Sequence, residues 1–287
     1  MSEYADRNQA RLPLGDGAVA VSSAGGTFLG GMGIALTGFV VVSALAAPWL
    51  APEDPFSVAG PSLAPPATGH WMGTDALGRD LFSGVVWGGR ASLVVATTSA
   101  LLALGIGLIV GMVSGYRGGW TDDFLMRVTE LFQTIPRFFF AIVVIALFGP
   151  GVDRLIVALG LTSWAGLARV VRSEVLSLRE REFVEAARAY GASPARIILV
   201  EILPNALPSA LVMFGLVAAN VILVEASLGF IGLGDPNVMS WGLLAGQAQG
   251  FLRSAWWMWF FPGVAIVTAA LGLNLLVDGL TPGQGRG

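Results

Sequence analysis

The chain contains several long stretches with almost no charged residue, and these constrain its fold more than any other feature. A helix needs roughly 20 apolar residues to cross the hydrocarbon core of a bilayer. The stretches near or above that length are residues 28–50, 91–116, 125–148, 155–171, 206–233 and 255–277. The sequence therefore predicts an all-α membrane protein with about six transmembrane helices.

The composition agrees with this prediction. Hydrophobic residues make up 55% of the chain and charged residues 12%, whereas about a quarter of the residues of a soluble domain are charged. One bundle with short loops uses up 287 residues, which leaves no room for a second soluble domain. The chain has no cysteine, which excludes disulfides, thiolate metal sites and cysteine nucleophiles.

Three parts are expected along the chain. Residues 1–26 are small and polar and predict a disordered cytoplasmic tail, residues 27–280 form the transmembrane domain, and residues 281–287 form a short cytoplasmic tail. The sequence at residues 43–48 imitates a signal-peptide cleavage site. The apolar run before it is longer than the usual core of roughly 7–15 residues, and more spans follow, so an uncleaved first helix is favoured.

The arginines predict the orientation. Prolines between Pro48 and Pro66 make helix continuation implausible, so residues 51–90 are expected to form an outer loop. Arginines are most frequent between the fourth and fifth stretches, in residues 173–205. Because cytoplasmic loops carry the excess of basic residues, we predict a multi-pass protein of the cytoplasmic (inner) membrane with both termini in the cytoplasm.

The polar segment 173–205 has the pattern of two short helices joined by a turn. Residues 180–190 are rich in helix formers, and Gly191 offers the left-handed conformation that ends a helix. Ser193 can cap the next helix, with Pro194 at its first position. The prolines at 204 and 208 are expected to end that second helix before the fifth span.

The first of these short helices has a surface suited to a partner protein. Small residues near its tip let another surface approach closely, and the charges around them can fix the register of a complex. These residues are Ala186, Ala187, Ala189, Arg181, Glu182, Glu185 and Arg188. The alternative from the residues alone is an ordinary solvated loop.

The same segment resembles a known family. Glu185-Ala186-Ala187, with Gly191 and Leu203-Pro204 at the matching distances, is similar to the EAA loop of ABC importer permeases, the element that couples them to their ATPase subunits. Glu201 stands where that family usually has isoleucine.

Other motifs resemble one branch of that family. The segment Gly73-Thr74-Asp75-Ala76-Leu77-Gly78-Arg79-Asp80 is similar to the signature of the C-type subunit in dipeptide, oligopeptide and nickel importers. Residues 226–234 with 240–242, and 261–263 with Asn274 and Asp278, resemble its last two spans. The resemblance covers roughly residues 28 to 280, and Gly84 stands where the family often has arginine.

The resemblance implies the type I importer permease fold and a function. This chain would form half of a pore for peptides, or alternatively for nickel or another small solute, together with a paired B-type permease subunit. Two ATPase subunits would bind ATP and Mg, an extracytoplasmic binding protein would deliver the solute, and lipid would surround the pore. The ATPase-coupling residues implied are Glu185, Ala186, Ala187, Gly191, Arg181, Arg188, Leu203 and Pro204.

The chain is not expected to be an enzyme or to bind a cofactor. It has no phosphate-cradling glycine loop followed by lysine, and it has no lysine at all, so ATP must be hydrolysed by another chain. We expect no nucleic-acid partner. No metal site is expected either, because the single histidine, His70, and scattered carboxylates do not supply enough ligands.

Two charged residues fall inside apolar spans. A charge there is costly, so Glu225 and Arg137 either face the pore or pair within the bundle. In the expected outer loop, Asp75, Arg79 and Asp80 either make a fold-internal ion pair or meet the binding protein.

Glycines in the second span also show a pattern. Gly107, Gly111 and Gly115, with Gly105 near them, form a ladder of small residues that lets helices pack backbone to backbone, within the chain or against a partner permease.

Two other classes of function remain open from the residues. A secondary transporter would use Glu225 and Arg137 as relay residues and would work without an ATPase, against which the coupling loop argues. A membrane-bound enzyme would use Asp75, Asp80 and His70 and would show turnover as a purified single chain.

Overall fold

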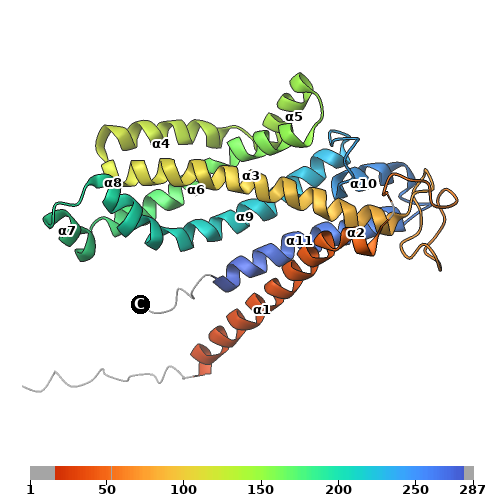
Figure 1. The fold of residues 1–287 in the computed structure, drawn as a ribbon, viewed down its shortest axis with the longest axis horizontal. Coiled ribbons are helices and arrows are strands. Elements are labelled where there is room, and N and C mark those ends of the chain that lie inside the picture. Colours follow the sequence, from red (N-terminus) through yellow and green to blue (C-terminus); the bar gives the residue numbers. More distant parts are fainter. Residues whose placement is uncertain (1–16, 53, 281–287) are drawn as a thin grey trace, which may run out of the picture.

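Long helices run side by side along one axis of the molecule (Figure 1). The computed structural model describes residues 17–52 and 54–280. Its long helices are α1 (Gly17–Leu45), α3 (Leu81–Arg117), α6 (Val152–Leu178), α9 (Leu203–Phe230) and α11 (Trp257–Leu280). Within the described residues, five helices are long and apolar enough to cross a membrane, or six if one bent pair counts as a span. The predicted all-α class with about six spans is confirmed.

Short elements lie at the two ends of the long axis. The end that we call the α7 end carries α7 (Glu182–Ala189), α8 (Pro194–Arg196) and the π-helical turn η1 (Ile197–Ile202). The opposite end carries α2 (Ala47–Leu50), α10 (Trp241–Gln247) and the 3-10 turn η2 (Ala248–Phe251). It also carries residues 54–80, which we call the signature loop and which contain only isolated bridges.

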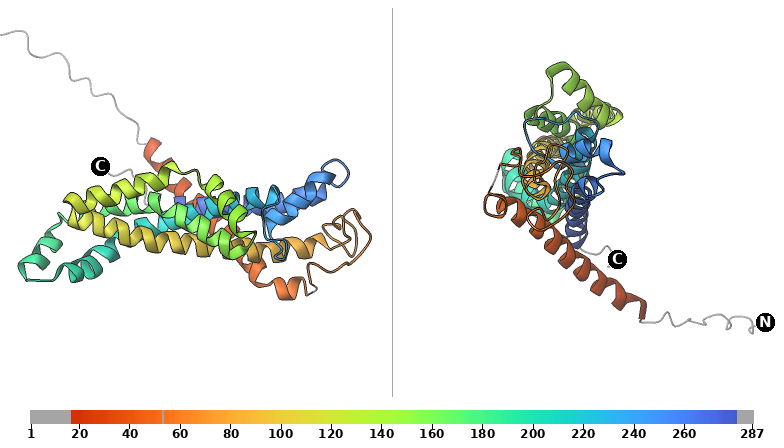
Figure 2. Two further views of the ribbon diagram at one scale, coloured as in Figure 1. Left: turned by 90° about the horizontal axis from the view of Figure 1, so that it is seen from above. Right: turned by 90° about the vertical axis from the view of Figure 1, so that its right-hand side faces the viewer.

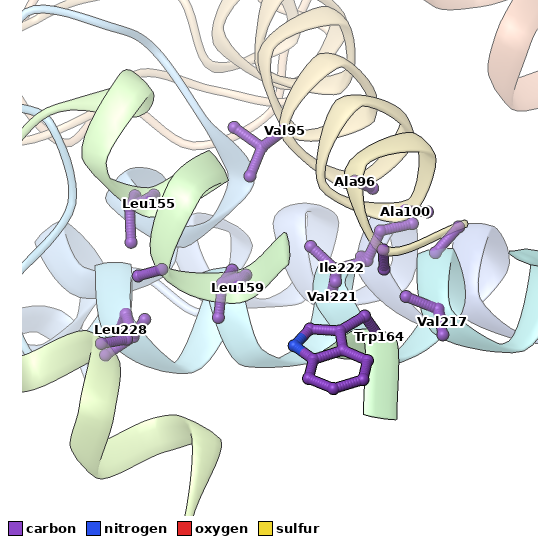
Figure 3. Packing of buried hydrophobic residues seen from close by; sticks show 14 of the residues in the cluster. Val95, Ala96, Ala100, Leu155, Leu159, Trp164, Val217, Val221, Ile222 and Leu228 are labelled. Atoms are coloured by element: carbon purple, nitrogen blue, oxygen red, sulfur yellow. The ribbon is translucent and has the colours of Figure 1, made fainter. Parts of the chain in front are cut away.

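Helices α3, α6 and α9 enclose the central core, where mostly small and branched side chains interlock (Figure 3). Core residues include Val95, Ala96, Ala100, Leu155, Leu159, Trp164, Val217, Val221, Ile222 and Leu228. Alanine is frequent in this core because small side chains let helices approach closely in lipid, where van der Waals packing drives association.

Helix α1 packs mainly against α11 and leans away from the bundle at its N-terminal end (Figure 2). The two helices are close because glycines lie where they cross. A Cβ at Gly33 would overlap the backbone of Leu275 and Leu276, and one at Gly272 would lie 2.9 Å from the Oγ1 of Thr37.

The predicted third span, residues 125–148, is not one helix. It consists of α4 (Gly119–Thr134) and α5 (Arg137–Phe148), which meet at an angle of 77°. Proline disfavours helical backbone at the residue before it, and Ile135 before Pro136 is extended, with φ −81° and ψ 117°. We call this break, residues 135–136, the kink.

Three predicted boundaries were wrong. Helix α1 begins at Gly17, so residues 17–26 are helical, while residues 1–16 and the predicted tail 281–287 lie outside the described residues. Helix α3 begins at Leu81, inside the predicted loop 51–90, because Asp80 caps it. The prolines at 204 and 208 do not end a helix, since η1 continues directly into α9.

Candidate functional sites at the two ends of the bundle

Helix α7 is held on the bundle by one buried side chain. Val184 has no exposed surface and packs with residues of α6 and η1, among them Val171, Val175, Ile197 and Ile202. Arg188 adds a second contact, its guanidinium lying 5.5 Å from the centre of the Tyr116 ring at the end of α3. These contacts tie α7 to α6, to η1 and to the end of α3.

The chain leaves α7 as its sequence predicts. Gly191 adopts a left-handed φ of 78°, and its N–H donates to the carbonyl of Arg188 at 2.9 Å. Ser193 then accepts a hydrogen bond from the N–H of Arg196 at 3.4 Å and caps α8.

The opposite face of α7 is open. Arg181, Glu185 and Ala186 are exposed there, and Tyr190 just beyond the helix is 92% exposed. Ala187 is half-buried against the cluster that holds Val184.

The remaining residues of the predicted coupling set lie at the start of α9. Leu203 packs against the hydrophobic cluster that contains Val184, whereas Pro204 is exposed. Some residues of the predicted coupling set are therefore exposed, whereas Ala187 and Leu203 pack against the cluster beneath them.

A charged network that sequence reasoning missed ties three helices together near α7. Arg172 on α6 donates two hydrogen bonds to Asp122 on α4, from Nε to Oδ1 and from Nη2 to Oδ2, both at 2.6 Å. The hydroxyl of Ser114 on α3 also donates to Asp122. Arg179 donates to the carbonyl of Gly115 at 3.0 Å. No local pattern singles these residues out, because Asp122 and Arg172 are 50 residues apart in the sequence.

The signature motif builds the signature loop and starts α3. Oδ1 of Asp75 accepts the N–H groups of Leu77 and Arg79, both at 2.8 Å. Gly73 and Gly78 both have φ of 77°, which a residue with a side chain rarely adopts. Asp80 accepts the N–H of Ser83 at 2.8 Å as the cap of α3.

The charged residues of this motif do not pair with each other. Asp80 Oδ1 lies 3.1 Å from Nδ1 of His70, and Arg79 stacks on the ring of Phe56, 5.1 Å from its centre. Within the described part of the chain, no three histidine, aspartate or glutamate side chains are grouped so that they could hold a metal ion.

A hydrogen bond and apolar packing fasten the signature loop to α11. The indole Nε1 of Trp257 on α11 donates to the carbonyl of Thr74 at 3.0 Å, and the Thr74 hydroxyl donates to the carbonyl of Pro61 at 2.6 Å.

We predict that Trp257→Phe lowers the free energy of unfolding by about 1 kcal/mol, because the buried carbonyl of Thr74 loses its donor while most of the ring remains. The melting temperature of the purified protein measures this. Trp256→Phe is the matched control, since Trp256 is 50% exposed. Equal melting temperatures for the two variants would contradict the prediction.

Glu225 lies in the bundle interior, with 2% exposure. Its Oε2 accepts the hydroxyl of Ser92 on α3 at 3.0 Å, and the same hydroxyl accepts the N–H of Trp241 at 3.3 Å. Glu225 therefore links α9 to α3 and α10. Arg137 lies at the kink and donates to Oδ1 of Asn220 on α9 at 3.3 Å.

Most of the glycine ladder lies between α3 and α6. A Cβ at Gly111 would lie 2.6 Å from the carbonyl oxygen of Ala168, and one at Gly115 would lie 2.8 Å from Cβ of Val175. Gly107 meets Leu167 in the same way, whereas a Cβ at Gly105 would have no neighbour within 4 Å. The ladder is thus a packing seam inside the chain.

Comparison with known proteins gives consistent matches. Residues 107–284 match the family described as "Binding-protein-dependent transport system inner membrane component". The chain is 39% identical over 248 residues to the dipeptide transport system permease protein DppC of Bacillus subtilis, covering 84% of this chain and 77% of that protein. A putative peptide permease protein of Brucella suis is 41% identical over 218 residues, covering 75% of this chain and 72% of that protein.

A solved structure shares the fold. The MetNI methionine ABC transporter in an inward-facing conformation matches with a TM-score of 0.58 and 22% identity, over 70% of this chain and 98% of the matched chain.

Proposed function

Because the chain belongs to the family of binding-protein-dependent transport system inner membrane components, we propose that it is the C-type permease subunit of an ATP-driven peptide importer. It forms half of a pore with a paired B-type permease. Two ATPase subunits bind ATP and Mg and supply the energy, and an extracytoplasmic binding protein supplies the solute.

The observation that carries this proposal is the construction of α7. Its exposed side offers Arg181, Glu185 and Ala186 to a partner, while Val184 fixes its other side to α3, α6 and η1. A partner that pushes on α7 therefore moves the ends of the spanning helices. Such a contact couples ATP to solute only if the two favour different global states of the complex.

The distribution of arginines favours one orientation of the chain in the membrane. The α7 end contains most of the arginines of the long polar segment 173–205, which favours the cytoplasm by the positive-inside rule. The signature loop then lies outside, at the opposite end of the bundle, where a binding protein docks. Both termini are cytoplasmic in this arrangement.

The solute class follows from relatives. The curated relatives are named dipeptide or peptide permeases, and this chain shares about 40% identity with them. Peptides are therefore the favoured solute, and nickel or another small solute is the alternative.

The test is ATP hydrolysis by the complex co-purified with the subunits encoded beside it, with and without binding protein and a dipeptide mixture. We expect stimulation in the wild type and its loss in Glu185→Arg, because a reversed charge on the exposed face of α7 opposes the partner charges that fix the contact. A loss of about tenfold or more is expected for a contact worth about 1.4 kcal/mol.

Asp153→Arg is the control, because this side chain is 78% exposed at the opposite end of α6 and its reversal leaves α7 untouched. If no ATPase co-purifies and Glu185→Arg still transports normally, the chain is not an importer subunit and works as a secondary transporter.

A further inference from the structure

Two arginines lie beside the kink, each hydrogen-bonded to a neutral amide. Arg137 at the start of α5 donates to Asn220 on α9 at 3.3 Å, and Nη1 of Arg169 on α6 donates to Oε1 of Gln133 on α4 at 2.6 Å. Arg169, Gln133 and Asn220 are exposed, and Arg137 is partly exposed. Four helices thus contribute one polar group each to two hydrogen-bonded pairs that flank the kink.

This region lies at membrane depth. Arg169 is about 14 Å along α6 from its α7 end, and Asn220 is about 15 Å along α9 from the opposite end, at 1.5 Å per residue. Both distances place the side chains inside a hydrocarbon core about 30 Å thick. A charged side chain at that depth is costly in lipid and is expected to face the interior of an assembly or a water-filled cavity.

Within residues 17–52 and 54–280, neither arginine has a carboxylate within ion-pair distance; the ion pairs there involve other residues. Glu225, on the same helix as Asn220, is buried and bonded to Ser92. Glu130 is exposed one turn before Gln133 on α4 and makes no ion pair with either arginine.

The chemistry of the two side chains suits a passing anion. A guanidinium has five N–H donors, and a single amide oxygen occupies only part of this capacity. Its planar fork matches a carboxylate in a bidentate geometry. A neutral amide is a weaker hydrogen-bond partner for arginine than a carboxylate, so an arriving carboxylate can replace the amide. When the carboxylate leaves, the arginine can bond to the amide again. Transport requires this kind of reversible binding.

We propose that Arg137 and Arg169 bind the carboxylate of the solute as it passes the kink, with Gln133 and Asn220 holding the guanidinium groups between transport events. The inference rests on the proposed importer function, and it deepens that function by assigning the passage a preference for solutes that carry a carboxylate, such as peptides. These are substrate-positioning residues of the pore rather than parts of the coupling helix.

The experiment measures uptake of a dipeptide mixture into proteoliposomes that contain the complete complex, supplied with its binding protein and ATP. The double variant Arg137→Gln/Arg169→Gln is expected to reduce uptake by about tenfold or more, because charge-assisted hydrogen bonds to the carboxylate are lost. Basal ATP hydrolysis and the ratio of subunits in the complex are expected to stay at wild-type values. The double variant with lysine at both positions keeps the charge but lacks the bidentate fork, so it is expected to recover only part of the uptake.

Arg127→Gln is the matched control, since it removes one exposed positive charge from α4 about two turns before the kink. Wild-type uptake in the double glutamine variant would overturn the inference. So would loss of the paired permease from that variant, because the arginines would then be pairing with a carboxylate of the partner subunit. If the wild-type complex shows no ATP-driven peptide uptake, the proposed function fails. If the wild type transports peptides and the double glutamine variant transports them equally well, only the role of the two arginines fails.

Discussion

Gly111→Leu is expected to prevent stable folding, with a loss of about 3 kcal/mol or more in the free energy of unfolding, at the upper end of overpacking effects. Even a Cβ at this position would lie 2.6 Å from the carbonyl oxygen of Ala168 and 2.7 Å from Cβ of Val171. The obstacles are a backbone oxygen of α6 and the Cβ of Val171, which is bonded directly to that backbone, so α3 and α6 must separate. Tryptophan fluorescence during thermal unfolding in detergent, together with the yield of monodisperse protein, measures the effect.

Gly105→Leu is the matched control on the same helix. A Cβ there has no neighbour within 4 Å and the position is exposed, so leucine would face lipid. Leucine also favours helix more than glycine by about 0.5–1 kcal/mol, so this variant is expected to be neutral or slightly stabilised. A similar loss in both variants would show that the glycines act through helix flexibility and that the packing seam is not the cause.

Asp122→Ala is expected to cost about 2–3 kcal/mol and to loosen the junction of α3, α4 and α6 near α7. The change leaves the Arg172 guanidinium without its bidentate partner in a partly buried site. Breaking a fully buried pair typically costs about 3–5 kcal/mol. The expected cost here is smaller, because the Arg172 side chain is 32% exposed and water partly solvates its charge. Thermal unfolding measures the loss, and stimulated ATP hydrolysis measures its consequence for coupling.

A double-mutant cycle separates this ion pair from other effects. Asp122→Ala/Arg172→Ala is expected to lose less stability than the sum of the single variants, because removing both partners leaves no uncompensated charge. Glu130→Ala, an exposed acidic residue on the same helix, is the control and is expected to change stability by less than about 0.5 kcal/mol. Additive losses in the cycle would contradict a direct interaction between Asp122 and Arg172.

Local sequence signals correctly predicted most of the spans and the turn after α7, because neighbouring residues determine these elements. Apolar length located the spans, and the turn after α7 follows from Gly191, Ser193 and Pro194 as expected. The family resemblance is also confirmed by the match over residues 107–284.

The effect of the helix prolines was predicted wrongly at two places, since residues 125–148 were expected to form one continuous span and the prolines at 204 and 208 were expected to end a helix. Pro136 breaks the third span, because Ile135 before it is extended. The prolines at 204 and 208 lie within continuous helical backbone, since η1 runs directly into α9 and Ile202 and Leu203 pack in the same hydrophobic cluster as Val184. The residue type is the same, and the neighbouring contacts decide the outcome.

The sequence by itself determined that this chain is a multi-span helical membrane protein with a protruding short helix, since span length, helix capping and charge bias act within a few turns of the chain. The tertiary structure alone decided which polar residues meet. Asp122 and Arg172 are 50 residues apart, Ser92 and Glu225 are 133 apart, and Trp257 and Thr74 are 183 apart. No local pattern encodes such pairs, because they depend on how α3, α6, α9 and α11 pack around glycine and alanine seams, and that packing fixes which side chains come within hydrogen-bond distance.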